Sequence, residues 1–131
     1  MNSTASSASA TPEFKKHLGR AIDLKNEDRY EEAAQLLEYL RGTNPQSASV
    51  YALLGHALWE QGKLPEAVSS FRRAVELSPK SELASLGLFH TSMESGDMRG
   101  ADAEMNRFLA VADSEEYDAI AKGPAQEKPA K

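Results

Sequence analysis

Three histidines are the side chains best suited to chemistry in this sequence of 131 residues, which contains no cysteine. They are His17, His56 and His90, and the last two lie thirty-four residues apart. A neutral imidazole can ligate a metal or carry protons near neutral pH. A metal site also needs a third ligand and outer partners, and no Cys, Asp or Glu stands at a recognised spacing beside this pair. We therefore expect no metal and no cofactor, and interpret His56 and His90 as solvated or partner-contacting side chains.

The remaining reactive side chains form no catalytic arrangement. Ser69, Ser70 and Ser78 have no evident base, and the sequence contains no glycine-rich phosphate loop, nucleophile elbow or metalloprotease motif. Acidic residues gather toward the C-terminus, where a solvated surface is their commonest role. They are Glu94, Asp97, Asp102, Glu104, Glu115, Glu116 and Asp118. The sequence therefore predicts that the protein is not an enzyme.

Composition excludes several classes of partner. Hydrophobic residues make up 40% and charged residues 27%, which is ordinary for a globular protein. The net charge of -5 argues against nucleic acid, whose phosphates require a basic stripe. No stretch approaches the ~20 apolar residues of a membrane span, and residues 1–10 lack the pattern of a secretory signal. The absence of cysteine fits a reducing compartment. We expect a cytoplasmic protein that binds neither nucleic acid nor membrane.

The elements that position these side chains are clearest between Ser47 and Pro79, where two apolar stripes recur at three and four residues. Ser47 is a good N-cap for the first helix, Gly62 separates the two helices, and Pro79 ends the second. The first stripe is Val50, Tyr51, Leu54, Ala57 and Leu58, and the second is Leu64, Ala67, Val68, Phe71, Ala74 and Val75. This segment is predicted to form an antiparallel helix pair.

The pair repeats with a period of thirty-four residues. Ala33, Ala67 and Ala101 stand at this spacing. The same step links Tyr30, Leu64 and Met98; Leu37, Phe71 and Met105; Asp28, Gly62 and Gly96; and Pro45 and Pro79. The middle segment resembles the tetratricopeptide repeat family, which has this period and a helix–turn–helix unit. The matching residues are Tyr51, Leu54, Gly55, Leu58, Gly62, Ala67, Phe71, Ala74 and Pro79. The resemblance spans roughly residues 12–113.

The resemblance implies an all-α superhelix of three helix pairs, at about 12–45, 47–79 and 81–113, followed by a capping helix at 114–122. Residues 11–122 would form one domain, and 1–10 and 123–131 are expected to be disordered. We expect Thr11 and Ser81 to cap helices, Gly42 to end one, and residues 113–116 to form a capping box.

Two departures from the family pattern leave the local register open. Arg20-Ala21 stands where the middle repeat has Leu54-Gly55, with Leu18-Gly19 as an alternative two residues earlier. In the third repeat Phe89 replaces the glycine, so we expect a shifted contact that uses Gly87.

A second stripe lies beside the core stripe on the first helix of each repeat. It reads Leu18, Ile22, Lys25, then Ala52, His56, Trp59, then Leu86, His90, Met93. In tetratricopeptide proteins this wall is concave and commonly holds the ligand, and a wide apolar patch usually indicates a partner. The predicted partner-binding residues are Lys15, Leu18, Ile22, Ala52, His56, Trp59, Leu83, Leu86, His90 and Met93.

The same wall argues against one class of ligand. Family members that hold acidic chaperone tails use lysine, asparagine and arginine there. The matching residues in this chain have no side-chain donor; they are Leu18, Ile22, Leu53, Leu83 and Gly87. The sequence therefore favours an apolar peptide or helix, and a basic one is compatible with the acidic net charge.

Three functions remain open from the sequence. The first is an adaptor or chaperone-like module that binds a partner protein in the groove. The second is a dedicated inhibitor, immunity-type protein or secretion chaperone for one partner, which the acidic charge suits. The third is a structural homo-oligomer, such as a homodimer. The alternative occupants of the groove are the last helix, the chain's own tail and a second copy.

Overall fold

The computed structural model describes residues 11–123, which form seven α-helices and no strand. Neither the predicted disordered lead, 1–10, nor residues 124–131 of the predicted tail belong to this described part. None of the described helices is long and apolar enough to cross a bilayer. The helices are α2 (Pro12–Asn26), α3 (Tyr30–Thr43), α4 (Ala48–Glu60), α5 (Leu64–Leu77), α6 (Glu82–Glu94), α7 (Met98–Leu109) and α8 (Glu115–Lys122).

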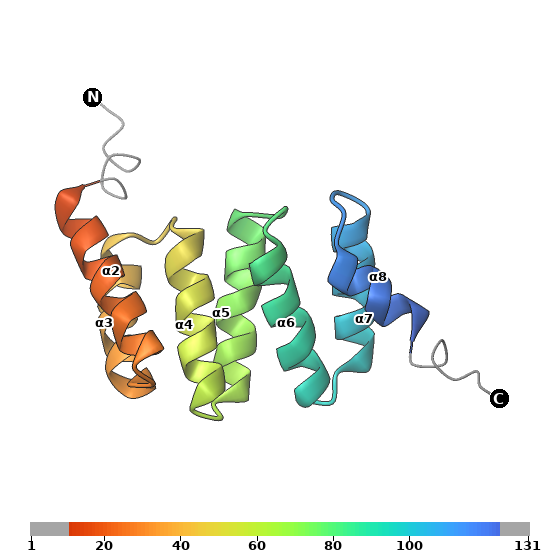
Figure 1. Cartoon of the computed structure of the whole chain (residues 1–131), viewed down its shortest axis with the longest axis horizontal. Coiled ribbons are helices and arrows are strands. Elements are labelled where there is room, and N and C mark those ends of the chain that lie inside the picture. Colours follow the sequence, from red (N-terminus) through yellow and green to blue (C-terminus); the bar gives the residue numbers. More distant parts are fainter. Residues whose placement is uncertain (1–10, 124–131) are drawn as a thin grey trace.

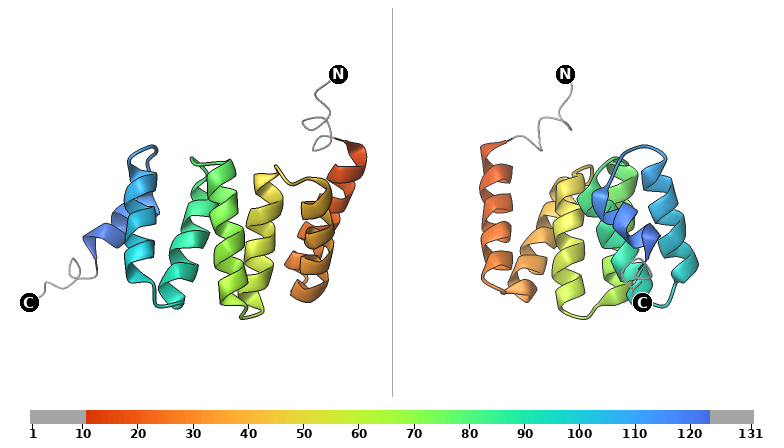
Figure 2. Two further views of the ribbon diagram at one scale, coloured as in Figure 1. Left: turned by 180° about the vertical axis from the view of Figure 1, so that it is seen from behind. Right: turned by 45° about the vertical axis from the view of Figure 1, so that its right-hand side comes forward.

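The first six helices form three antiparallel pairs that stand side by side in chain order (Figures 1 and 2). The first helices of the pairs share one wall, since α4 contacts both α2 and α6. The short α8 lies across the end formed by the third pair. The predicted all-α superhelix of three helix pairs with a terminal helix is confirmed.

Each first helix begins at the predicted capping residue. The hydroxyl oxygens of Thr11, Ser47 and Ser81 accept hydrogen bonds from the backbone N–H three residues later, at 3.1, 3.3 and 3.2 Å. Each bond satisfies an N–H that has no carbonyl partner at the start of a helix. Pro12 then occupies the first turn of α2, where its missing N–H costs nothing.

The turn within each pair repeats as well. Asp28, Gly62 and Gly96 have φ of 63°, 79° and 87°, the left-handed region that glycine enters without steric cost. In the first pair an aspartate takes this conformation, and its Oδ1 accepts a hydrogen bond from the Tyr30 hydroxyl at 2.9 Å. The same turn conformation thus recurs in all three pairs, at the thirty-four-residue step.

The predicted end of α3 at Gly42 is wrong, because the helix continues to Thr43. Gly42 is not left-handed, and the N–H of Asn44 still donates to the carbonyl of Leu40 at 2.8 Å. Pro45 restricts the conformation of Asn44 before it, so the helix ends here rather than at the glycine.

The second and third pairs meet around one ring. Phe71 of α5 is 2% exposed, and a Cβ added at Gly55 or Gly87 would lie 2.9 or 2.3 Å from its ring. Glycine at both positions lets the ring lie against the backbones of α4 and α6. The expectation that Gly87 makes the close contact is therefore confirmed, while Phe89 is buried and faces Tyr117 of α8.

In the first repeat, Arg20-Ala21 and not Leu18-Gly19 is the equivalent of Leu54-Gly55, and Ala21 makes the close contact. Ala21 is buried and Arg20 is exposed, whereas a Cβ on Gly19 would meet no atom within 4 Å. Alanine is small enough for the contact that glycine makes in the middle repeat.

Helix α8 starts at Ser114, whose hydroxyl accepts from the N–H of Tyr117 at 3.1 Å and donates to Glu82 at 2.6 Å. The expected capping box does not form, since the residue three positions after the cap is Tyr117, which has no carboxylate. Glu116 instead lies 3.4 Å from His90.

Candidate functional site

Two adjoining cavities hollow the wall formed by the first helices. One, of about 300 Å³, is lined by Lys25, Ala52, Leu53, His56, Trp59, Phe71, Leu83, Leu86, Gly87, His90 and Glu116. The other, of about 280 Å³, is lined by Leu18, Ile22, Ala48, Ser49, Ala52, Leu53, Ser78, Ser81, Leu83 and Ala84. Because Ala52, Leu53 and Leu83 line both, we treat them together as the concave groove.

The structure brings together eight of the ten predicted partner-binding residues. Leu18, Ile22, Ala52, His56, Trp59, Leu83, Leu86 and His90 line the concave groove. Lys15 and Met93 line neither cavity. Both are exposed, and each lies one helical turn outside the lining residue of its own helix, Leu18 or His90.

Several of these residues belong to the core as well as to the groove. Ala52 is only 9% exposed, and Trp59 packs against the core clusters on both sides of α4. Leu18 and Leu86 are half-buried and pack against the first and third clusters. By contrast, Leu83 is 71% exposed. Leu83 is therefore an apolar side chain of the groove that contributes little to the packing of the core.

His56 and His90 lie on neighbouring first helices with Trp59 between them, as the repeat step indicates. The ring of Trp59 stands 6.3 Å from each imidazole, edge-on to His56 and nearly parallel to His90. Burial lowers the pKa of His56, and the nearby charge of Lys25 lowers it further. His56 is therefore neutral at pH 7. No group of three or more His, Cys, Asp or Glu within residues 11–123 is arranged to hold a metal ion.

Sequence reasoning missed some lining residues. Phe71 reaches the cavity from α5 past two glycines, which the core stripe alone does not reveal. Glu116 comes from α8, outside the repeats, so no thirty-four-residue step points to it. Ser49 lines the groove from the first turn of α4, and Ser78 and Ser81 line it from the loop before α6.

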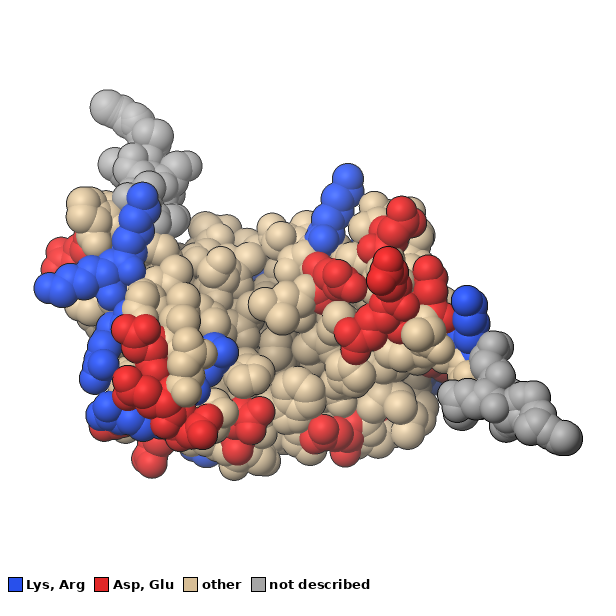
Figure 3. Space-filling view, viewed as in Figure 1, with Lys and Arg blue, Asp and Glu red and all other residues tan. Residues whose placement is uncertain are grey.

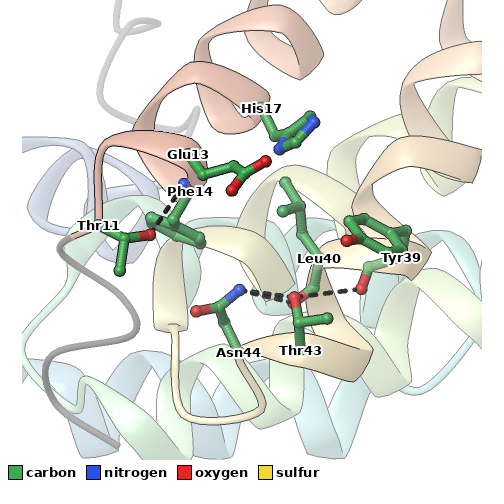
Figure 4. Close-up of a pocket in the computed structure, with 8 residues that line it drawn as sticks. All are labelled: Thr11, Glu13, Phe14, His17, Tyr39, Leu40, Thr43 and Asn44. Atoms are coloured by element: carbon green, nitrogen blue, oxygen red, sulfur yellow. Dashed lines mark hydrogen bonds between the residues drawn. The ribbon is translucent and has the colours of Figure 1, made fainter. Parts of the chain in front are cut away.

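A separate polar pocket of about 220 Å³ lies between the start of α2 and the end of α3 (Figure 4). Asn44 is buried and donates to Thr43 and Leu40, while its Oδ1 has no hydrogen-bond partner within residues 11–123. His17 and Tyr39 meet edge to face at 6.0 Å at its rim. The pocket shares no lining residue with the concave groove.

Charge is unevenly distributed over the grooved face. Figure 3 shows a largely uncharged middle, with basic and acidic side chains mixed over the α2 end and mainly acidic ones over the α8 end. The exposed basic residues of α2 include Lys15, Lys16 and Arg20, and the first turn of α8 carries Glu115, Glu116 and Asp118.

Comparisons with known proteins identify the repeat. Two models of the tetratricopeptide repeat family match residues 18–82 and 58–122. A curated relative, small glutamine-rich tetratricopeptide repeat-containing protein 2 of Mycosarcoma maydis, is 38% identical over 72 residues, or 53% of this chain. The match spans only 20% of that relative's length.

Solved structures share the fold. The type III secretion chaperone SycD of Yersinia enterocolitica, in complex with a peptide of the translocator YopD, superposes with a TM-score of 0.75 at 13% identity, covering 88% of this chain and 89% of that one. The second tetratricopeptide domain of Spaghetti (RPAP3), bound to the HSP90 peptide SRMEEVD, gives 0.69 at 18% identity, covering 74% and 90%. Together with the thirty-four-residue helix pairs and the family models, these similarities show that the chain belongs to the tetratricopeptide repeat family.

Proposed function

We propose that the chain is a protein-interaction module that holds a peptide or helix of a partner protein in the concave groove. The observation that carries the proposal is an apolar hollow in which exposed leucine and aromatic side chains meet. Leu83, 71% exposed, projects where both cavities meet, and the rings of Trp59 and Phe71 line one of them. Apolar pockets with aromatic anchors are typical of peptide-binding surfaces.

The structural relatives support this assignment through their bound peptides. SycD was solved with a peptide of YopD, and the Spaghetti domain with a peptide of HSP90. Both contain helix pairs arranged as in this chain. We extend peptide binding to this chain because its own groove is apolar and accessible, and we assign the role to residues 11–122 as one domain in the cytoplasm.

The groove differs from one suited to acidic tails. Leu18, Ile22, Leu53, Leu83 and Gly87, which occupy the predicted clamp positions, all line the concave groove. None of these side chains donates a hydrogen bond to a carboxylate. We therefore propose that peptides such as SRMEEVD, with its three acidic residues, are poor ligands of this chain.

The test uses a matched pair of exposed apolar residues. Leu83→Gln removes an apolar side chain from the groove, while Met98→Gln does the same at the start of α7, away from it. Leu83→Gln should weaken binding of a partner peptide by more than ~1 kcal/mol, and Met98→Gln should leave it unchanged. Calorimetric titration measures both. Equal affinities of the two variants would contradict the groove assignment.

Trp59→Ala is a second test, which removes a larger side chain from the groove. It should weaken binding of the same peptide by more than ~1 kcal/mol, as for a buried aromatic anchor. Because Trp59 also packs on two core clusters, its helicity and melting temperature must be measured alongside.

A dedicated chaperone or inhibitor of a single partner is the second candidate. It is favoured by the superposition on the secretion chaperone SycD, which covers 88% of this chain and 89% of that one. Affinity purification distinguishes the candidates, since one stoichiometric partner indicates a dedicated chaperone and several indicate an adaptor. Light scattering at several concentrations tests the third candidate, a homo-oligomer.

A further inference from the structure

Five side chains form a row across the larger cavity of the concave groove, from α2 to α8. Lys25 lies close enough to His56 to affect its charge, and His56 meets Trp59 at 6.3 Å. Trp59 lies nearly parallel to His90 at 6.3 Å, and Nε2 of His90 is 3.4 Å from Glu116. The row begins with a cation, continues through three rings and ends with a carboxylate.

Further carboxylates border the row. Glu94 of α6 accepts a hydrogen bond from the indole N–H of Trp59 at 3.0 Å. Glu60 lies 3.6 Å from His56. Among residues 11–123, Lys25 is the one lysine or arginine that lines this cavity, against three carboxylates on or beside it. The excess of negative charge lies on α6 and α8, away from Lys25.

The carboxylates at this end retain hydrogen-bonding capacity. The Glu116 side chain is 52% exposed, and its recorded polar contact is the long one to His90. Glu94 uses one oxygen for Trp59 and is likewise exposed. Each carboxylate offers about four acceptor positions, so both can receive further N–H donors. The face of Trp59 beside them suits a cation as well.

We propose that the occupant of the groove is an apolar segment of another protein that carries a lysine or arginine near one end. This cation pairs with Glu94 and Glu116 against Trp59 and His90. The apolar residues of the segment lie over Leu53, Leu83 and Leu86, and any acidic residue lies at the opposite end, toward Lys25. The groove thus selects apolar segments and also binds them in one orientation. This inference rests on the proposed function.

The probe is a displayed library of short random peptides, selected on the full chain in low-salt buffer. The selected peptides should carry several apolar residues and at least one lysine or arginine. Their affinity is then measured for the chain and for two double variants of equal charge change. Glu94→Lys/Glu116→Lys alters the acidic end of the groove, and Glu31→Lys/Glu66→Lys alters exposed residues of α3 and α5.

The groove variant should bind the selected peptides about tenfold more weakly, which corresponds to ~1.4 kcal/mol, while the control variant changes little. A photo-crosslinker placed beside the basic residue of the peptide should attach to α8 or the end of α6, not to α2. Circular dichroism melting of both variants verifies that the fold is retained.

The possible outcomes separate this inference from the proposed function. Apolar peptides without basic preference, or equal binding by both double variants, would overturn the charge assignment, while continued sensitivity to Leu83→Gln would preserve groove binding. Binding insensitive to both Leu83→Gln and the groove variant would overturn both proposals. A concentration-dependent dimer that excludes the peptides would show that a second copy occupies the groove, and would also overturn the inference.

Discussion

Two regions of the stack close the core in different ways. One is the seam between the second and third helix pairs, and the other is the C-terminal end. At the seam, Phe71 lies against the backbones of Gly55 and Gly87, so shape alone determines the contact. At the C-terminal end, Phe89 occupies the position that Gly55 has in the middle repeat, and no further repeat packs on it. A single tyrosine of α8, Tyr117, covers this ring at 5.4 Å.

The C-terminal end also depends on a buried chain of hydrogen bonds. Ser85 donates to Glu104 at 2.7 Å, and since a serine has one hydroxyl hydrogen, Tyr117 must donate to Ser85 at 2.8 Å. Arg107 neutralises Glu104 through two hydrogen bonds of 2.8 and 2.6 Å. The seam is therefore expected to be sensitive to added atoms, whereas the end is expected to be sensitive to the loss of the Tyr117 ring and of its hydrogen bond. The following predictions test this difference.

The largest effect is expected for Tyr117→Ala. The side chain is fully buried, and its removal should cost about 3–5 kcal/mol, as for other large aromatic side chains. An eight-residue helix is not stable alone, so α8 should detach while α2 to α5 stay folded. Native-state hydrogen exchange measures this as lost protection confined to α6, α7 and α8. Uniform loss of protection along the chain would show that the end is not a separable region.

A smaller loss is expected for Gly87→Ala. The added Cβ would lie 2.3 Å from the buried Phe71 ring, and overpacking of this kind costs about 1–3 kcal/mol. Gly19→Ala is the matched control, because its Cβ would meet no atom within 4 Å and alanine favours a helix by up to about 1 kcal/mol. Urea unfolding should therefore move in opposite directions for the two variants. A stabilised Gly87→Ala variant would show that the seam can widen.

Much of the fold could be predicted because one unit occurs three times. Serine or threonine at a helix start and a left-handed residue within the pair reflect local rules, and repetition distinguishes such signals from chance. Asp28 illustrates this point, since an aspartate alone does not predict a left-handed turn, but its register with Gly62 and Gly96 does.

The candidate site was predictable only where it follows the repeat. His56 and His90 are related by the repeat step, and both line the same cavity. Glu116 was not predictable as a groove residue, because its position depends on the packing of Tyr117 in α8, a long-range contact outside the repeat. The hydrogen bond from Ser114 to Glu82, across thirty-two residues, was equally outside the reach of the repeat pattern.

The smallest predicted effect concerns the hydroxyl that completes the C-terminal network. Burial raises the pKa of Tyr117 to about 12. In the unfolded chain a tyrosine titrates near 10, so between pH 10 and 12 the native state holds a proton that the unfolded state has lost. The stability contributed by this hydroxyl is therefore complete below pH 10 and is lost as the pH rises toward 12.

The measurement compares the free energy of unfolding of the protein and of Tyr117→Phe between pH 8 and pH 11.5. At pH 8 the variant should be less stable by about 1 kcal/mol, because one buried hydrogen bond is missing. Above pH 10 the protein should lose stability faster than the variant, by up to about 1.4 kcal/mol per pH unit, so the difference shrinks and then reverses sign before pH 11.5. Other tyrosines and lysines titrate in both proteins and cancel in the difference. Parallel curves would mean that the Tyr117 hydroxyl is solvated, and that the end of the stack is closed by shape in the same way as the seam.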